Sequence, residues 1–225
     1  MNTCKDKEVA FFGKITAGIT HELKNVLAII RESSGLMEDI ISISPEAIIK
    51  YQEKIQNSLV KIKDQVERGV DLTDRLNKFA HSTDEALSKI DLQETIGQLA
   101  ALAQRFARLK HIELKTVPQN IEDPPVTLVT RLVQLQMILF ASLECCFNAM
   151  SAGGEINIGI RKLEGKNEVH VVCKGDLPDQ AEFARNITGS EKWPVLQEIA
   201  ACLEGSADLE ETGHGILLGF PEKIR

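Results

Sequence analysis

The chain is poor in aromatic residues. They make up 4% of its 225 residues, with a single tryptophan and a single tyrosine. A core with few rings must be filled by leucine, isoleucine, valine and alanine, which is typical of helical bundles. Hydrophobic residues reach 43% and charged residues 26%, an ordinary globular composition that excludes long disorder. The length suits one large domain or two units of about 100 residues each.

The chain also lacks an excess of basic charge. Its 26 lysines and arginines stand against 33 acidic residues, for a net charge of −7. We therefore expect no nucleic-acid partner, since phosphate neutralisation needs a concentrated basic face. No apolar run approaches the ~18–20 residues of a membrane-spanning helix, and the mixed charges of the first residues are unlike a signal peptide. These absences predict a cytoplasmic protein without membrane contact.

Paired cysteine motifs are missing as well. The number of cysteines is odd, and no two have the CxxC spacing of a zinc site or a redox pair. Reduced thiols in a cytosolic protein explain this pattern better than a disulfide framework, and we expect no metal site. The five are Cys4, Cys145, Cys146, Cys173 and Cys202.

The first part of the chain has the periodicity of two long helices. Residues from about 5 to 42 alternate apolar steps of three and four, interrupted by one four–four step that resembles a stutter. The predicted seam is Phe12, Ile15, Ile19, Leu23, Val26, Ile30, Ser33, Met37 and Ile40. Ser44 and Pro45 are suited to begin a second helix, from about 45 to 82. Its predicted seam is Ile48, Gln52, Ile55, Leu59, Ile62, Val66, Gly69, Thr73, Leu76 and Ala80.

Two such helices predict an antiparallel hairpin. One hairpin buries a narrow apolar stripe, so we expect it to pair with a second copy as a four-helix bundle in a homodimer. Periodicity alone favours a structural coiled coil that has no chemistry. The predicted domain covers residues 1–85.

Residues 86–225 predict a different class of structure, an α/β sandwich of a mixed or antiparallel sheet with helices on one face. A capping box, Asp91 with Glu94, opens a helix. Alternating apolar residues around a turn at Glu164-Gly165-Lys166-Asn167 indicate a β-hairpin. The other expected elements are a strand at 111–117, helices at about 127–152 and 193–204, and two short apolar segments at 206–211 and 215–220.

His21 is the residue that stands out chemically. It lies two positions from Ile19 and from Leu23, so helix geometry turns it away from the seam toward solvent. By position alone, it is compatible with an ordinary surface histidine. A zinc-protease HExxH motif is excluded because Asn25 stands where the second histidine belongs.

The neighbours of His21 form a known pattern. The segment from Gly13 to Leu27, with its core HELKNVL, resembles the phosphoacceptor box of bacterial sensor histidine kinases. It departs at Val26, where that family usually has proline, and the helix is expected to be less kinked. The resemblance implies that His21 carries a phosphoryl group, that Glu22 accepts a proton or orients the ring, that Lys24 lies beside the phosphoryl group, and that Asn25 positions water. An exposed imidazole next to a carboxylate is a usable nucleophile near neutral pH.

The resemblance extends to the second half. Residues Leu132 to Ala152, with Asn148-Ala149 and Ala152, are similar to the nucleotide-domain helix of histidine kinases and GHKL ATPases, a Bergerat-type fold. It implies that Asn148 holds a magnesium ion. Glu144 lies four residues before Asn148, about one helical turn, so both side chains can face one site. Glu144 is equally compatible with a polar edge residue on a buried helix.

Two nucleotide motifs of that family are absent. Where it has Asp-x-Gly-x-Gly to read adenine and admit the nucleotide, this chain has Cys173-Lys174-Gly175-Asp176-Leu177-Pro178. Where it has a glycine-rich phosphate loop, this chain has Thr188-Gly189-Ser190-Glu191-Lys192-Trp193-Pro194. One glycine with a Trp and a Pro does not supply the flexible amides that cradle phosphates.

With a phosphoacceptor box present and two nucleotide motifs absent, the chain resembles the histidine phosphotransferases of bacterial phosphorelays that descend from kinases. His21 would exchange phosphate with response-regulator receiver domains, which supply Mg²⁺, and ATP binding would be lost. One alternative is an autophosphorylating cytoplasmic kinase with an atypical pocket, whose input would come from a partner since no sensor segment precedes the first helix. A second alternative is a non-catalytic dimeric scaffold that binds regulators.

Overall fold

The computed structural model describes residues 4–83, 85–119, 124–150, 153–163, 165–211 and 213–224. It contains two compact units, each described here by itself. The hairpin unit is Gly13–His81. The α/β unit contains the described residues from Ser82 onward together with residues 4–12. The domains expected from the sequence, 1–85 and 86–225, stay a prediction.

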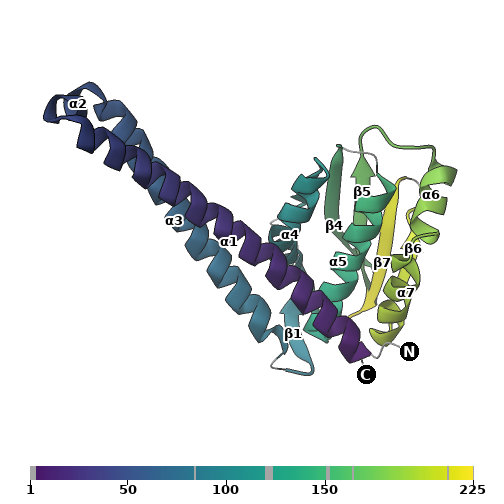
Figure 1. Cartoon of the computed structure of the whole chain (residues 1–225). Helices are drawn as coiled ribbons and strands as arrows, with labels where there is room; N and C mark the ends of the chain where they lie inside the picture. The colour runs from purple at the N-terminus through teal and green to yellow at the C-terminus, as the bar shows by residue number, and fades with distance from the viewer. Residues whose placement is uncertain are drawn as a thin grey trace. The chain divides into compact units, whose positions relative to one another are not determined.

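The hairpin unit is built from helices α1 (Cys4–Ile43), α2 (Pro45–Lys50) and α3 (Gln52–Ala80). Residues of α1 from Gly13 onward lie beside α3, as Figure 1 shows. The predicted seam of α1 is confirmed at Ile15, Ile19, Val26, Ser33 and Ile40, all of which are buried. Val26 packs against Gly69 of α3, where a Cβ would lie 3.4 Å from its Cγ1.

The prediction of one unbroken second helix is wrong. Tyr51 separates α2 from α3 because its backbone leaves the helical region, with φ −113° and ψ 20°. The ammonium groups of Lys50 and Lys54 lie 5.3 and 5.2 Å from the centre of its ring. These cation–π contacts are favourable with the tyrosine in this turned position.

The predicted seam of the second helix is also partly wrong. Gln52, Leu59, Val66 and Thr73 are exposed, whereas Ser58 and Phe79 are buried. Two stripes of side chains run along α3, and both fit a spacing of seven residues. One contains Ser58 and Phe79, and the other, one position later in the chain, contains Leu59 and Val66. The stripe of Ser58 and Phe79 is buried, and that of Leu59 and Val66 is open.

The α/β unit contains a mixed five-stranded sheet in the order β2-β4-β5-β7-β6. Strands β2 and β4 are parallel, and the other neighbours are antiparallel. The strands are β2 (Glu113–Thr116), β4 (Glu155–Leu163), β5 (Lys166–Lys174), β6 (Ser206–Leu209) and β7 (Gly215–Pro221). The helices lie against one face, as Figure 1 shows: α4 (Leu92–Leu109), α5 (Leu132–Ala149), α6 (Gln180–Thr188) and α7 (Lys192–Cys202).

The expected fold class, a helical hairpin followed by an α/β sandwich, is confirmed. The capping of α4 is confirmed too, since the Asp91 carboxylate accepts the Glu94 backbone N–H at 2.9 Å. The β-hairpin is confirmed, with Ile156 opposite Cys173 and Ile158 opposite Val171. The two short apolar segments are the antiparallel pair β6 and β7.

The expected helix at 127–152 is wrong at its start. Residues Thr127–Thr130 form strand β3, which pairs antiparallel with β1 (Ser88–Asp91), and α5 begins only at Leu132. Each strand is four residues long, and the strand that accepts and donates its backbone hydrogen bonds lies about forty residues away in the chain. Helix α6 was not expected at all, and Asp179 caps it by accepting the Glu182 N–H at 2.9 Å.

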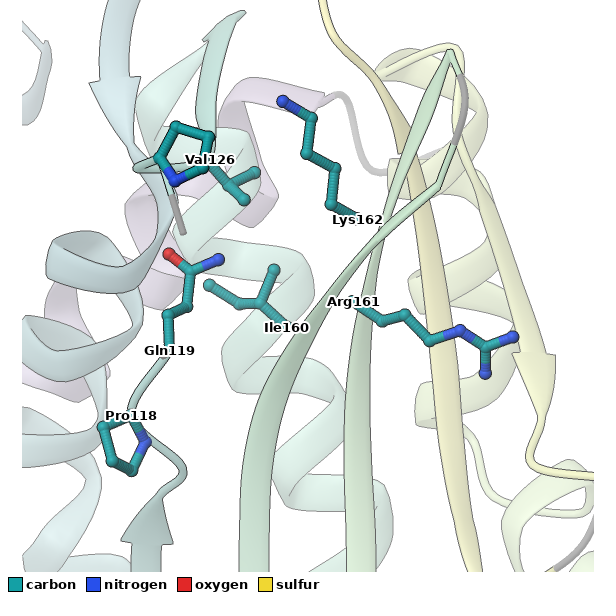
Figure 2. A pocket seen from close by; sticks show the side chains of 7 residues that line it. Pro118, Gln119, Val126, Ile160, Arg161 and Lys162 are labelled. Atoms are coloured by element: carbon teal, nitrogen blue, oxygen red, sulfur yellow. The ribbon is translucent and has the colours of Figure 1, made fainter. Parts of the chain in front are cut away.

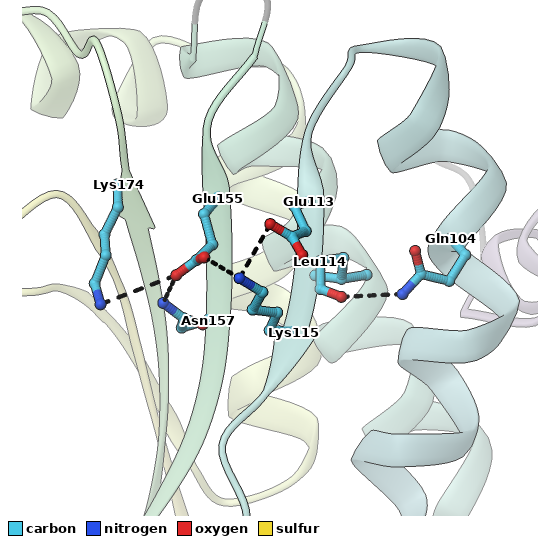
Figure 3. Close-up of polar contacts among 7 residues, drawn as sticks. All are labelled: Gln104, Glu113, Leu114, Lys115, Glu155, Asn157 and Lys174. Carbon is cyan, nitrogen blue, oxygen red and sulfur yellow. Dashed lines mark hydrogen bonds and ion pairs between the residues drawn. The ribbon is translucent and has the colours of Figure 1, made fainter.

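Polar contacts join the strands on the sheet face away from these helices, as Figure 3 shows. The Lys115 ammonium of β2 binds Glu113 at 3.0 Å and also binds Glu155 of β4. Lys174 of β5 lies 4.0 Å from Glu155. Hydrogen bonding to Lys115 lowers the pKa of the Glu155 carboxyl. These pairs favour the observed register, in which Lys115 stands beside Asn157.

The first turns of α1 pack inside the α/β unit. The Phe11 ring lies 5.7 Å from that of Phe140 on α5, which lies 5.2 Å from that of Phe106 on α4. Lys7 forms an ion pair with Glu198 of α7. Residues 4–12 therefore complete the core of this unit.

Helix α5 corrects the expectation that no segment has the length and apolar composition of a membrane span. Leu132–Ala149 has both, with a mean hydropathy of 1.4, and it alone does so among the described helices. Within this unit it is a core helix, since 72% of the segment is buried. A helix that is apolar on all sides is typical of a buried core position.

Candidate functional site

His21 lies on the exposed side of α1, as the sequence predicts. Its neighbours along the helix, Gly18, Ile19, Glu22 and Val26, are buried, whereas His21, Lys24 and Asn25 are exposed. The amide nitrogen of Asn25 lies 3.4 Å from Nδ1 of His21, one turn away. The imidazole and the lysine ammonium are thus open to a partner, with an amide beside one ring nitrogen.

Glu22 lies on the inner side of the hairpin. It is 7% exposed, and its carboxylate forms an ion pair with the Arg68 guanidinium of α3. The residues expected to act together are therefore divided: His21, Lys24 and Asn25 share the outer surface, and Glu22 is held inside. The role of Glu22 as a proton acceptor stays a prediction.

Arg68 was missed by the sequence reasoning. It lies one residue before Gly69, a predicted seam position, and nothing in its local pattern marks it. The feature of the sequence that indicated a partner of this kind was Glu22. It falls on the same helical stripe as Ile15, Ile19 and Val26, and a carboxylate buried on such a stripe needs a cationic partner.

Asn148, at the end of α5, lines an open cavity of about 430 Å³ in the α/β unit. The other polar residues that line it are Asp176, Glu182 and Asn186. Glu144 is not among the lining residues, and its carboxylate lies 3.8 Å from the ammonium of Lys192. The structure thus brings Asn148 into a cavity and pairs Glu144 with the start of α7.

The segment where a phosphate loop would lie is a tight turn between α6 and α7. The backbone N–H of Gly189 donates to Arg185 at 2.8 Å, that of Ser190 to Ile187 at 3.1 Å, and that of Trp193 to Ser190 at 3.0 Å. The N–H of Lys192 donates to the Ser190 hydroxyl at 3.2 Å. Gly189 has right-handed helical backbone angles, φ −79° and ψ −7°. These amides are used within the turn itself and do not cradle an anion.

Gly175 after β5 and Gly154 before β4 allow two backbone segments to approach closely. Gly175 has φ +132°, and a Cβ there would lie 3.0 Å from the Cα of Gly154. Gly154 in turn has φ +101° and leaves no room for a Cβ beside the carbonyl oxygen of Lys174, at 2.6 Å. The start of β4 and the end of β5 are therefore in close backbone contact. This contact explains the two glycines without a bound nucleotide.

A second cavity, also of about 430 Å³, lies toward the other end of β4, as Figure 2 shows. Pro118, Gln119, Pro124 and Val126 line one part, and Ile160, Arg161 and Lys162 the other. Among the described residues, no cluster of three or more histidine, cysteine, aspartate or glutamate side chains is arranged to hold a metal ion.

No protein-family model and no curated protein matches this chain. Among solved structures, the chain is similar to a nucleotide-free catalytic domain of the histidine kinase ThkA, at 16% identity over 63% of this chain and 100% of that chain, with a TM-score of 0.49. It is similar to ThkA in complex with the response regulator TrrA, at 18% identity over 95% of this chain and 63% of that chain, with a TM-score of 0.48. A bacterial phosphotransferase matches at 14% identity over 93% of this chain and 95% of that chain, with a TM-score of 0.47.

Proposed function

We propose that this chain is a histidine-containing phosphotransfer protein of a two-component phosphorelay. His21 carries the phosphoryl group and exchanges it with the aspartate of a response-regulator receiver domain. One contrast carries the proposal. His21, Lys24 and Asn25 of the HELKN motif lie together on an exposed helix face, whereas the amides of the phosphate-loop segment donate within their own turn.

The transfer needs little from the chain beyond a positioned imidazole. A ring nitrogen of His21 attacks phosphorus, and the bond from phosphorus to the aspartyl oxygen breaks, with its electron pair returning to the carboxylate. Asn25 lies beside Nδ1, so Nε2 is the ring nitrogen that faces away from it. We assign the attack to Nε2, in the tautomer that carries its proton on Nδ1 with the amide oxygen of Asn25 turned toward it. Lys24 supplies positive charge beside the transferred group, and the receiver supplies Mg²⁺. Phosphoryl transfer of this kind depends mainly on positioning and charge neutralisation.

Loss of ATP binding is the second part of the proposal. Two carboxylates, Asp176 and Glu182, line the cavity at Asn148, and no lysine or arginine is among its described lining residues. Such a lining disfavours a triphosphate by charge repulsion. The Lys192 ammonium, which could offset it, lies beside Glu144. The phosphoryl group on His21 would therefore come from a receiver and not from ATP.

The third part concerns assembly and location. The open stripe of α3, with Leu59 53% and Val66 50% exposed, is suited to pair with a second hairpin in a homodimer. Docking of the receiver would use the exposed side of α1 around His21. A partner of this kind implies a cytoplasmic protein.

Two labelling reactions test the proposal. The chain is incubated with labelled ATP and Mg²⁺, and separately with a receiver domain labelled on its aspartate. We expect label on the chain from the receiver alone. We expect His21→Ala to abolish it, and the control His111→Asn to leave it unchanged, because His111 is an exposed histidine at φ +57°, a conformation that asparagine tolerates.

Other outcomes would overturn the proposal in distinct ways. Label from ATP that is lost in His21→Ala would identify an autophosphorylating kinase. Receiver binding without any label, unchanged in His21→Ala, would identify a scaffold. A direct titration with ATP distinguishes the kinase from the proposed phosphotransfer protein, because we expect the latter not to bind ATP at micromolar concentrations.

A further inference from the structure

The cavity toward the far end of β4 has a basic and partly apolar lining. Its polar lining residues are Gln119, Arg161 and Lys162, and none of its described lining residues is acidic. Two prolines, a valine and an isoleucine form the rest of the wall. The volume of about 430 Å³ lies in the range of small-molecule sites. This lining suits a molecule that has a negatively charged group and an apolar part.

Lys162 is the cation that this cavity has available. Figure 2 shows the side chains of Lys162 and Arg161 leaving β4 in opposite directions, as successive residues of a strand do. Arg161 stands opposite Glu168 of β5 and interacts electrostatically with its carboxylate. Lys162 is exposed, and no acidic side chain in the described part of the chain forms an ion pair with it. Its ammonium is therefore free to bind an added anion.

Asn167 is an independent sign of a ligand. It stands directly across from Lys162 in the antiparallel pair of β4 and β5. Directly opposite residues of such a pair point to the same face of the sheet, with their Cβ atoms about 5 Å apart. Asn167 is 1% exposed, and within the described residues neither the nitrogen nor the oxygen of its side-chain amide has a hydrogen-bond partner. A buried amide in this state is destabilising, so its presence beside a free lysine points to a ligand that completes its hydrogen bonds.

We propose that this cavity binds a small phosphate monoester, with the phosphate between Lys162 and Asn167 and the organic part against Ile160 and the prolines. The amide of Asn167 decides the class of anion. Its NH₂ group donates to an anionic oxygen, and its carbonyl oxygen needs a donor. A phosphate monoester has a second pKa of about 6, so near neutral pH its protonated form offers both acceptor oxygens and a hydroxyl donor. A carboxylate offers acceptors alone and leaves the carbonyl oxygen unpaired.

Binding at this position involves a movement of Lys162. Asn167 is buried and is not among the lining residues of the cavity, so the anion reaches it when the lysine side chain turns toward the amide. The lysine stem is flexible, and the turn breaks no ion pair with a described residue. In the complex the ammonium and the amide both gain charge-assisted hydrogen bonds, which offset the cost of burying the amide.

The test uses phenyl phosphate as the probe and ¹H–¹⁵N spectra of the full-length chain as the readout. We expect the probe to shift the side-chain NH₂ signals of Asn167, which are assigned by their absence in Asn167→Leu. Lys162→Met and Asn167→Leu should each weaken binding about tenfold or more, the usual effect of losing a hydrogen bond to a charged group. Should Asn167→Leu fail to fold by circular dichroism, Lys162→Met, at an exposed position, tests the site by itself.

Three further compounds test the chemical class. Benzoate has the same ring with a carboxylate, and benzyl alcohol has it without charge, so both should bind about tenfold more weakly than phenyl phosphate or not at all. Inorganic phosphate lacks the ring and should bind more weakly because it leaves the apolar wall uncovered. Equal binding of benzoate would contradict the role of the amide, and equal binding of inorganic phosphate would contradict the monoester.

The matched control is Lys174→Met. Lys174 is an exposed lysine at the opposite end of the same β-hairpin, 4.0 Å from Glu155, and its replacement should leave the affinity for phenyl phosphate unchanged. His21→Ala should leave it unchanged too, because His21 belongs to the hairpin unit. Unshifted Asn167 signals at millimolar phenyl phosphate would overturn the inference, and so would binding that is as tight in Lys162→Met as in the wild type. Neither result depends on phosphotransfer, which the labelling reactions measure separately.

Discussion

His21 and Glu22 are adjacent in the chain and lie in opposite environments. One step along an α-helix is a rotation of about 100°, so neighbours on the edge of a seam separate into an exposed and a buried side chain. The exposure of His21 was predictable from Ile19 and Leu23 alone. The partner of Glu22 was not, because Arg68 lies 46 residues away and no local pattern connects the two.

Four described cysteines are reduced, and they differ sharply in environment. Cys145, Cys146 and Cys173 are buried, and Cys202 is exposed. Burial, and to a lesser extent the charge of Glu144, raises the pKa of Cys145 to about 11. Because the thiolate is the reactive form, burial and a raised pKa both protect this thiol.

This difference predicts selective alkylation. At neutral pH, an iodoacetamide reagent should modify Cys202 readily and leave Cys145 and Cys146 unmodified until the protein is unfolded. Mass spectrometry of the peptides after timed quenching measures both. Equal rates at Cys202 and Cys145 in the folded protein would contradict the packing of α5 described above.

At the scale of elements, α3 presents two stripes and the hairpin covers one. Ser58 and Phe79 of one stripe are buried, and Leu59 and Val66 of the other are half exposed. The sequence predicted an apolar seam on this helix, but a spacing of seven does not say which of two adjacent stripes faces which partner. Which stripe is buried is decided by packing against segments remote in the chain.

The open stripe leads to a test of the homodimer. Leu59→Glu with Val66→Glu should halve the molar mass measured by light scattering, because charges replace the apolar surface that a second hairpin would cover. Lys61→Glu is the control, since it changes charge on the same helix about 200° around from Leu59. A wild-type chain that is monomeric at micromolar concentration would rule out the dimer, and so would a double variant that keeps the wild-type mass.

The β-strands show the same limit of local patterns. The hairpin of β4 and β5 was predictable because alternating residues flank a turn. Strands β1 and β3 were not, because each is four residues long and its hydrogen bonds go to a distant partner. Helix α6 was missed because its buried apolar residues are only two, Phe183 and Ile187.

At the scale of the whole molecule, α1 belongs to two units. Residues 4–12 pack in the α/β unit, and from Gly13 the helix belongs to the hairpin. The predicted seam begins only at Phe12, so periodicity gave no sign that the residues before Gly13 pack in another unit. The contact between the rings of Phe11 and Phe140 joins the start of α1 to the α/β unit.

Removing this contact should weaken the α/β unit. Phe11 is 7% exposed, and Phe11→Ala should lower the free energy of unfolding by about 3–5 kcal/mol, the usual cost of deleting a buried ring. Trp193 of α7, the single tryptophan, reports on this unit by fluorescence during denaturant unfolding. Val9→Ala, at a position 72% exposed, is the control and should cost under about 0.5 kcal/mol. Equal stability of Phe11→Ala and Val9→Ala would show that residues 4–12 do not support the unit.

The sequence by itself determined the features that depend on neighbours in the chain. These are the exposed His21 with Lys24 and Asn25, the helical hairpin, the capped start of α4, the β4–β5 hairpin and a phosphate-loop segment with one glycine. The tertiary structure decided what depends on distant partners: the Arg68 ion pair of Glu22, the covered stripe of α3, the β1–β3 pair and the place of residues 4–12 in the α/β unit. The physical reason is that helical and strand periods orient side chains locally, whereas burial and charge pairing are settled only when remote segments meet.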